Sequence, residues 1–506
     1  MKVSRFLKRW RRSAFALLLA PPAIALAALE ARAATPVPTP TVTSAATGNG
    51  VPWRSTTQDI ASFGYVQNEF LLEGTARSYV ATVNLASVTN GQWDAAPTGP
   101  TAPYKVRILI ERPKNAARFN GTVLVEWLNV SAGMDSGTFD SFRDWFMREG
   151  YAYVGVSAQA VGVNHLQKWD AGRYGSLTHP GDSYSYDIFS QAARALRVGD
   201  PAPLGDLTGR VKSLVAWGGS QSGGRLFTYA NAIHHDARVI DGIVPFVTSR
   251  GSPLTQDPLP AVPTPTGAAA VLRTDLQTPI LFQVSEAEAI ASARGVHTQS
   301  DATHLRVWEH AGMSHASRSS TTQMATGAPQ APGGSGVQCS GPPLNGLNAA
   351  PVWRAMINAM HVWTQQGKAP ASAPRIELAI PDDSTKPATP VRDSATGLAK
   401  GGIRLPQVAA PVATRWGSRP QGLQEGPGCG AYGTSDPWNG DSDAWDRDPS
   451  LNISPIPEPS LLALYKNDEG YRKAIDVSAR QLVAKGWLLP DDAKAIAQEA
   501  KDIQIR

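Results

Sequence analysis

Cysteine is scarce in this chain: Cys339 and Cys429 are the only two among 506 residues. So few cysteines exclude a disulfide-rich scaffold, and neither has the C-x-x-C spacing that is typical of zinc or redox sites. A metal site at His234 and His235 is not expected, because adjacent helical residues face different directions. No metal ligand cluster is evident elsewhere, so we expect no metal and no cofactor. An internal repeat is also missing, which argues against solenoids and propellers.

Long apolar runs are missing too, except for the run from Ala14 to Leu29. Basic residues precede this run, and Ala31-Arg32-Ala33, which follows it, is typical of a signal-peptide cleavage site. A membrane anchor is the alternative, but Pro21-Pro22 and the short run fit a spanning helix poorly. We expect residues 1–33 to be a signal peptide of a periplasmic or secreted protein that has no membrane span after cleavage.

A strong excess of one charge is absent once this segment is removed. The whole chain carries +5, but residues 1–33 hold seven basic residues and one acidic residue, which leaves about −1 for the remainder. This balance gives no support for a nucleic acid or an acidic membrane as partner. Export would also remove the chain from the reducing cytosol, so we expect a Cys339–Cys429 disulfide.

Apolar strands alternate with helical segments through the middle of the chain. The segments predicted as strands are 121–129, 150–157, 213–217, 242–248, 279–284 and 305–308. Helices are expected at 139–149, 187–197 and 225–235. This alternation indicates an α/β fold with a mainly parallel central sheet and helices on both faces. Functional residues in such sheets gather beyond the carboxyl ends of the strands.

The flanking segments depart from this alternation. Residues 34–56 are rich in Thr, Pro, Ala and Gly, which predicts a flexible lead-in, and residues 57–506 are expected to form one catalytic domain. The features expected in that domain are N-terminal strands between 63 and 112, long loops at 251–270 and 316–351, a helix near 352–367, and a C-terminal extension at 376–506 with helices in 459–502.

The stretch Ala216–Gly224, AWGGSQSGG, directly follows an apolar strand. Small residues around a serine at this place are typical of a nucleophile elbow, a strained strand-to-helix turn that presents the serine hydroxyl above the sheet. Two frames fit, one centred on Ser220 and the other on Ser222. We favour Ser220, because the strand ends three residues before it, whereas Ser222 would lie in the first helical turn. A glycine-rich turn without catalysis is the alternative.

An acid and a histidine follow in the chain order expected for such a serine. Glu286 and Glu288 come after the strand at 279–284, and His315 lies in the loop after the strand at 305–308. A histidine with a pKa near 6.5 can take the serine proton, and a carboxylate fixes its tautomer. We expect Glu288 and His315 in these roles. Glu286 is the alternative acid and His310 the alternative histidine.

The oxyanion of an acyl-transfer intermediate needs two hydrogen-bond donors. We expect one from the backbone of Gln221 and the other from the loop Asn129-Val130-Ser131, which follows the strand at 121–129. The segment RYGSLTHPGDSYSYDIF is dense in aromatic and polar residues, so Tyr174 and His179 are candidates for substrate contacts at the pocket rim. The alternative is a loop that hydrogen bonds hold together.

Several strings, including VLVEWLNVSAG, GYAYVGVSAQAVGV, GGSQSGGRLFTYANAIH and LRVWEHAGMSH, resemble those of bacterial, often exported proteins described as alpha/beta hydrolase domain proteins. The resemblance covers about residues 60–500, and the G-x-S-Q-S element is similar to the G-x-S-Q-G elbow of cutinases. It implies an α/β-hydrolase fold with Ser220, Glu288 and His315 as the triad. One departure is Glu288, where the family carries Asp.

Together these features predict an exported serine hydrolase that cleaves small carboxylic esters through an acyl-enzyme, without a cofactor. An acyltransferase with the same triad is one alternative. A non-catalytic binding protein on a hydrolase fold is another, because a fold alone does not confer activity.

Overall fold

The computed structural model describes residues 36–46, 48, 50–56, 58–316, 345, 347–417, 431, 433–437 and 461–505. The expected signal peptide, both cysteines and most of the loop 316–351 lie outside these residues. Within the described ranges, no helix is long and apolar enough to cross a membrane.

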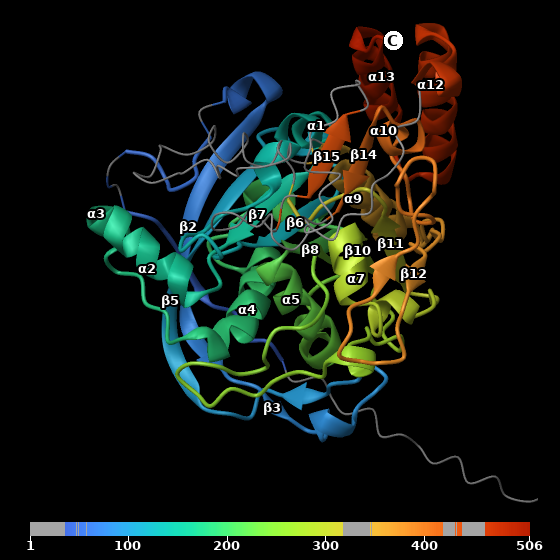
Figure 1. Ribbon diagram of the computed structural model, residues 1–506. Coiled ribbons are helices and arrows are strands. Elements are labelled where there is room, and N and C mark those ends of the chain that lie inside the picture. Colours follow the sequence, from blue (N-terminus) through green and yellow to red (C-terminus); the bar gives the residue numbers. More distant parts are fainter. Residues whose placement is uncertain are drawn as a thin grey trace, which may run out of the picture. The chain divides into compact units, whose positions relative to one another are not determined.

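A nine-stranded sheet forms the centre of the structure (Figure 1). In spatial order its strands are β1 (Thr41–Ser44), β2 (Tyr65–Arg77), β5 (Thr101–Pro113), β7 (Ala152–Val156), β6 (Thr122–Trp127), β8 (Ser213–Gly219), β9 (Gly242–Phe246), β10 (Ile280–Ser285) and β11 (Leu305–His310). The six strands from β7 to β11 in this order are parallel. Antiparallel pairing joins β1, β2, β5 and β7. The expected mainly parallel sheet is confirmed.

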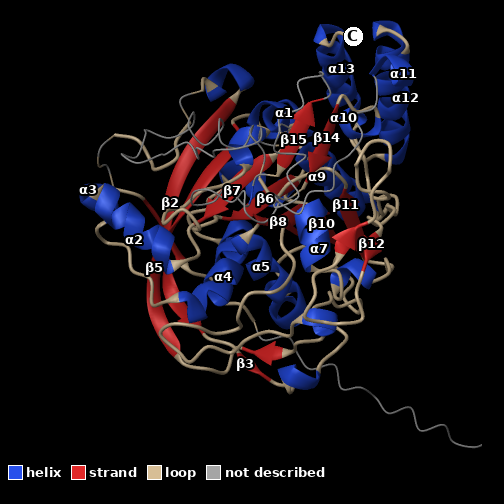
Figure 2. Cartoon of the chain, in the orientation of Figure 1, coloured by secondary structure: helices blue, strands red, loops and turns tan. Residues whose placement is uncertain are grey.

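Helices surround this sheet (Figure 2). Their bounds are α1 (Arg143–Arg148), α2 (Ala160–Trp169), α3 (Ala171–Tyr174), α4 (Ser185–Val198), α5 (Gln221–Thr228), α6 (His234–Ala237), α7 (Glu286–Ala291), α9 (Ala350–Gln366), α10 (Pro406–Ala409), α11 (Leu461–Tyr465), α12 (Asp468–Lys485) and α13 (Pro490–Glu499). The remaining short strands are β3 (Val80–Ala81), β4 (Ala95–Ala96), β12 (Leu378–Ala379), β13 (Thr389–Pro390), β14 (Ala413–Trp416) and β15 (Thr434–Pro437).

Strand β6 shows why the central strands are continuous apolar runs. Its residues Val123 and Val125 belong to one buried cluster, which also contains apolar residues of α4 and α5. Leu124 between them belongs to a second cluster, which contains residues of α1 and α9. Successive strand residues point to opposite faces, so burial of both faces requires apolar residues at every position.

The helix predicted at 225–235 begins earlier, at Gln221, and passes through a π-helical turn, Tyr229–Ile233, into α6. Glycines in its first turn weaken the helix signal in the sequence. In the structure they allow α5 to approach β9 closely: a Cβ atom on Gly223 would lie 2.6 Å from the carbonyl oxygen of Phe246. Tertiary packing therefore decides where this helix starts.

The described part of residues 34–56 is more ordered than the flexible lead-in expected there. Strand β1 pairs with the edge of β2, and Val42 is buried. Trp53 is also buried, and its indole N–H donates to the carbonyl oxygen of Asp135 at 3.0 Å. Pairing of β1 with the edge of β2 and burial of the Trp53 ring keep this segment in place. Amino-acid composition alone reveals neither contact.

The C-terminal extension packs on the domain through its last helices. Helices α12 and α13 lie side by side (Figure 1). Their buried residues, such as Ile475 and Ile496, belong to the same apolar cluster as Trp353 and Met356 of α9. This extension is therefore part of the core rather than an appendage.

Candidate active site

Ser220 occupies the turn between β8 and α5. Its backbone has φ 59° and ψ −120°, a conformation that residues other than glycine rarely adopt. Its N–H donates to the carbonyl oxygen of Phe246 at 3.0 Å, and its carbonyl accepts the N–H of Gly224 at 2.9 Å. A Cβ on Gly219 would lie 2.4 Å from the Phe246 ring, so the turn requires glycine there. This is the strained strand-to-helix turn that the glycine pattern predicted.

Ser222, the other serine of the motif, lies in the first turn of α5. It is buried, and its hydroxyl donates to the carbonyl oxygen of Gly219 at 2.9 Å. Of the two serines, only Ser220 has the elbow conformation. Ser222 instead stabilises the turn from inside.

Glu288 and His315 form a hydrogen-bonded pair at the same edge of the sheet. Helix α7 follows β10, and a capping box joins Ser285 to Glu288. One carboxylate oxygen of Glu288 accepts the N–H and hydroxyl of Ser285. The other oxygen lies 2.7 Å from Nδ1 of His315. A carboxylate can only accept, so Nδ1 carries the proton and Nε2 is left as the basic nitrogen.

The pKa values of this pair move in opposite directions. Burial raises the pKa of Glu288, but the hydrogen bond and charge of His315 and the bonds from Ser285 lower it by more. Burial lowers the pKa of His315, but the hydrogen bond and charge of Glu288 raise it by more. The carboxylate therefore favours the imidazolium form of His315.

Ser220, Glu288 and His315 follow β8, β10 and β11, which all run in the same direction. Their carboxyl ends therefore meet at one edge of the sheet. No hydrogen bond between His315 and Ser220 occurs among the described contacts of the two residues. Catalytic hydrogen bonds are often long in free enzymes and shorten only when substrate binds.

Glu286, the alternative acid, and His310, the alternative histidine, have other partners. Glu286 is fully buried, and its carboxylate accepts the N–H of Gly312 at 2.9 Å and a guanidinium N–H of Arg392 at 2.7 Å. His310 lies within β11, 3.3 Å from the amide of Gln283, and burial lowers its pKa to about 3. Neither residue takes part in the Glu288–His315 pair.

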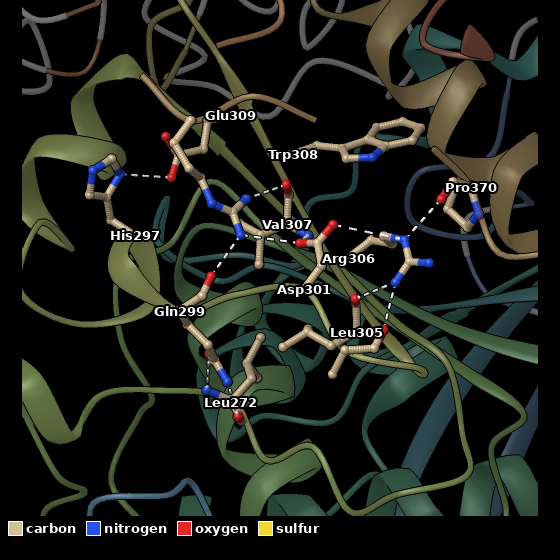
Figure 3. Close-up of polar contacts among 12 residues, drawn as sticks. Leu272, His297, Gln299, Asp301, Leu305, Arg306, Val307, Trp308, Glu309 and Pro370 are labelled. Carbon is tan, nitrogen blue, oxygen red and sulfur yellow. Dashed lines mark hydrogen bonds and ion pairs between the residues drawn. The ribbon is translucent and has the colours of Figure 1, made fainter. Parts of the chain in front are cut away.

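A second buried pair, His297 and Glu309, lies beside β11. Figure 3 shows the His297 ring pointing toward Glu309. The distance between Nδ1 of His297 and Oε1 of Glu309 is 2.8 Å. The other carboxylate oxygen accepts the N–H of Ile376 at 2.8 Å. The pair thus joins β11 to the C-terminal extension. Sequence reasoning missed it, although a glutamate within an apolar strand was a signal that a polar partner was needed.

The loop after β6 lies against the turn between β8 and α5 that carries Ser220, which we call the serine turn. The side-chain amide of Asn129 donates to the carbonyl oxygen of Gly219 at 3.0 Å. Its backbone N–H, however, already donates to Ser136 at 2.7 Å, so it is not free to bind an oxyanion as expected. Among the described residues the N–H of Val130 has no acceptor. The N–H of Gln221 is at the first position of α5, where no intrahelical acceptor exists.

The structure places Tyr174 and His179 in hydrogen-bonded networks. Tyr174 is fully buried; its hydroxyl donates to Glu69 at 2.6 Å and accepts the N–H of Trp53 at 2.9 Å. Both ring nitrogens of His179 have backbone partners, at Ala158 and Gly181. Their aromatic and polar character serves burial and loop structure here.

Asp182 is a polar centre that sequence reasoning did not single out. Its carboxylate accepts a guanidinium N–H of Arg225 at 2.7 Å and the side-chain amides of Gln159 and Gln256, both at 3.0 Å. Burial raises the pKa of Asp182, but the charge of Arg225 and the hydrogen bonds from the Ala160 N–H and the Gln159 amide lower it by more. The carboxylate joins α5 to the end of β7 and to the loop after β9.

Comparisons with known proteins identify the family of this chain. The chain matches the family model of the alpha/beta hydrolase domain over residues 35–498. A search of curated proteins found no similar sequence.

Solved structures with some likeness include a dienelactone hydrolase, described as putative, from Klebsiella pneumoniae (16% identity, 47% of this chain, 85% of that chain, TM-score 0.25). An acetyl xylan esterase from Paenibacillus has 16% identity over 39% of this chain and 54% of its own, with a TM-score of 0.20. A serine hydrolase without lid from Xanthomonas campestris has 12% identity over 46% and 83%, with a TM-score of 0.25. These TM-scores are low, so the assignment of this chain to a family rests on the family model.

The family match extends over nearly all of the described chain, including the serine turn and the Glu288–His315 pair. The α/β-hydrolase fold expected from the sequence is thereby confirmed. This chain belongs to the alpha/beta hydrolase domain family.

Proposed function

We propose that this protein is an exported serine hydrolase that cleaves carboxylic esters of small molecules through an acyl-enzyme. Ser220 is the nucleophile, His315 the general base and acid, and Glu288 the residue that orients His315. The observation that carries the proposal is the elbow conformation of Ser220 at the same sheet edge as the Glu288–His315 pair.

In the first half-reaction, Nε2 of His315 takes the proton of the Ser220 hydroxyl while the serine oxygen attacks the ester carbonyl carbon. The tetrahedral intermediate then collapses, the ester C–O bond breaks, and His315 gives the proton to the leaving alkoxide. A water molecule, deprotonated by His315, attacks the acyl-enzyme in the second half-reaction. This releases the carboxylic acid and restores Ser220.

The oxyanion of each intermediate needs two donors. The backbone N–H groups of Gln221 and Val130 are the donors that we assign, since both lack a described protein acceptor. Asn129 acts differently from the sequence-based expectation: its side chain ties the loop of Val130 to the carbonyl of Gly219.

Substitution of the two serines tests the nucleophile. Ser220→Ala should lower kcat for p-nitrophenyl butyrate by about a thousandfold or more, because the covalent route is lost. Ser222→Ala is the matched control and should keep kcat within about tenfold, because only one hydrogen bond to Gly219 is removed. Loss of turnover in Ser222→Ala with normal turnover in Ser220→Ala would reverse the assignment.

Two further results would redirect the proposal. A fluorophosphonate that fails to label the folded protein would favour a non-catalytic binding protein. Ester products that form from an added alcohol in preference to hydrolysis would favour an acyltransferase, which shares the same triad but excludes water better.

Export and the disulfide belong to the same proposal. The segments involved, residues 1–33, Cys339 and Cys429, lie outside the described residues, so the support is the sequence pattern. Mass spectrometry of a non-reduced digest of the exported protein should find the N-terminus after Ala33 and a Cys339–Cys429 peptide. An intact N-terminus or two free thiols would contradict the respective part.

A further inference from the structure

The C-terminal extension holds the segment that carries His315. We call residues 311–316 the histidine loop. Ile403 of the extension pairs with its start: the N–H of Ala311 donates to Ile403 at 3.0 Å, and the N–H of Ile403 donates to Glu309 at 2.7 Å. The extension thus adds a strand-like segment to the outer edge of β11.

Further contacts attach the extension along β11. Figure 3 shows the Glu309 carboxylate directed toward His297 and the Arg306 guanidinium directed toward the carbonyl oxygen of Pro370. The guanidinium of Arg375, the residue just before the extension, donates to the carbonyl oxygen of Val307, and the N–H of Ile376 donates to the Glu309 carboxylate. The strand that leads into the histidine loop is therefore held in place as well.

Glu286 joins the histidine loop to the extension directly. Its backbone N–H donates to the carbonyl oxygen of Met313 at 3.0 Å, and its carboxylate accepts the N–H of Gly312 at 2.9 Å. The other carboxylate oxygen accepts from Arg392 of the extension at 2.7 Å. Two of the three residues immediately before His315 are thus fixed by one residue.

The ion pair explains how this carboxylate tolerates full burial. An unpaired buried carboxylate is costly, and the positive charge of Arg392 offsets that cost. The extension also passes very close: a Cβ on Gly417 would lie 2.4 Å from the Cβ of Glu286. Removal of Arg392 would leave the carboxylate buried with only backbone donors.

We propose that Glu286, held by Arg392, is a positioning residue for His315; this inference rests on the proposed function. The two carboxylates at the start of α7 have different tasks. Glu288 bonds to the imidazole, and Glu286 bonds to the loop that carries it. Residues two apart on a helix face different directions, which makes this division feasible.

The test compares Glu286→Gln and Arg392→Met with Arg294→Met in the full chain. Arg294 also bonds to the extension, at Pro381 and Asp383, but has no described contact with the histidine loop. For p-nitrophenyl butyrate, the first two variants should lower kcat by about tenfold to a hundredfold with little change in KM, because His315 is misplaced. Arg294→Met should leave both constants unchanged.

Two measurements separate positioning from loss of stability. The acid midpoint of kcat/KM should shift to lower pH in Glu286→Gln and Arg392→Met, because a looser Glu288–His315 bond raises the pKa of His315 less. Hydrogen exchange should become faster in residues 311–316 in both variants. In Glu286→Gln, which leaves no buried carboxylate at this position, the melting temperature should change little, whereas Arg392→Met should also lower it because the buried carboxylate loses its counter-charge. Arg392→Lys should restore part of kcat, since it keeps the charge.

Normal kcat and an unchanged acid midpoint in both variants would overturn the inference. If the unmodified protein neither hydrolyses esters nor reacts with a fluorophosphonate, the proposed function fails instead. In that case hydrogen exchange still tests whether Glu286 and Arg392 hold the histidine loop. Unchanged exchange at residues 311–316 in both variants would show that they do not.

Discussion

The Glu288–His315 pair determines how the proposed activity depends on pH. The base must be neutral, so activity is lost as His315 becomes protonated. Because Glu288 raises the pKa of His315 despite burial, the acid midpoint of kcat/KM should lie above 6.5. In Glu288→Gln the charge is lost and burial remains, so the midpoint should fall and kcat should decrease by about a hundredfold or more.

A series of kcat/KM values between about pH 4.5 and pH 8.5 measures this midpoint, over a range of about two units on each side of the ordinary histidine pKa. His310→Gln serves as control, because burial already lowers the pKa of His310 to about 3 and it should stay neutral throughout. An acid midpoint that is the same in Glu288→Gln and in the unmodified protein would contradict the assigned role of Glu288.

Single residues also show where a sequence is ambiguous. Ser220 and Ser222 have similar neighbours in the chain, but only Ser220 lies in the left-handed region of φ. Glu286 and Glu288 are two residues apart, yet only Glu288 contacts His315. Such choices depend on how helices and strands pack, which residue identity does not reveal.

At the scale of elements, the serine turn depends on close contact between α5 and β9. Gly223→Ala should lower the free energy of unfolding by about 1–3 kcal/mol, because the added Cβ would lie 2.6 Å from the backbone oxygen of Phe246. The activity should decrease as well, since Phe246 also accepts the N–H of Ser220.

Urea unfolding measures this change, with Gly209→Ala as the matched control. A Cβ on Gly209 would have no atom within 4 Å, so its free energy of unfolding should change by less than about 0.5 kcal/mol. Equal stability of the two variants would mean that α5 and β9 are less closely packed than described.

At the scale of the whole molecule, α13 is tied to α9 by an ion pair with two hydrogen bonds between Arg354 and Asp492. Both side chains are largely buried. Asp492→Asn should therefore lower the free energy of unfolding by about 1–3 kcal/mol, because a charged hydrogen-bonded partner is lost.

The exposed pair Arg480–Asp476 on α12 provides the comparison. Water and salt screen this pair, so Asp476→Asn should change the free energy of unfolding by less than about 0.5 kcal/mol. Thermal or urea unfolding of both variants checks the difference. If Asp476→Asn lowered the free energy of unfolding by more than Asp492→Asn does, this result would contradict the packing of the extension on the core.

The sequence by itself determined the alternation of strands and helices, the glycine-rich serine turn, and the chain order of serine, acid and histidine. These features are local, since burial of both sheet faces and a tight turn each require certain residues at neighbouring positions. These local features were sufficient to predict the fold and to choose the candidate residues. They did not predict that Tyr174 is buried or that the segment around Trp53 is ordered.

Only the tertiary structure decided which candidates meet. Asn129 uses its N–H within its own loop, Tyr174 is buried beside Glu69, and Glu286 bonds to an arginine of the C-terminal extension. Each contact joins groups whose approach depends on the packing of whole elements. A hydrogen bond or ion pair forms only when the distance between its two atoms is correct to within a few tenths of an ångström. No pattern of residue types along the chain specifies atomic positions that closely.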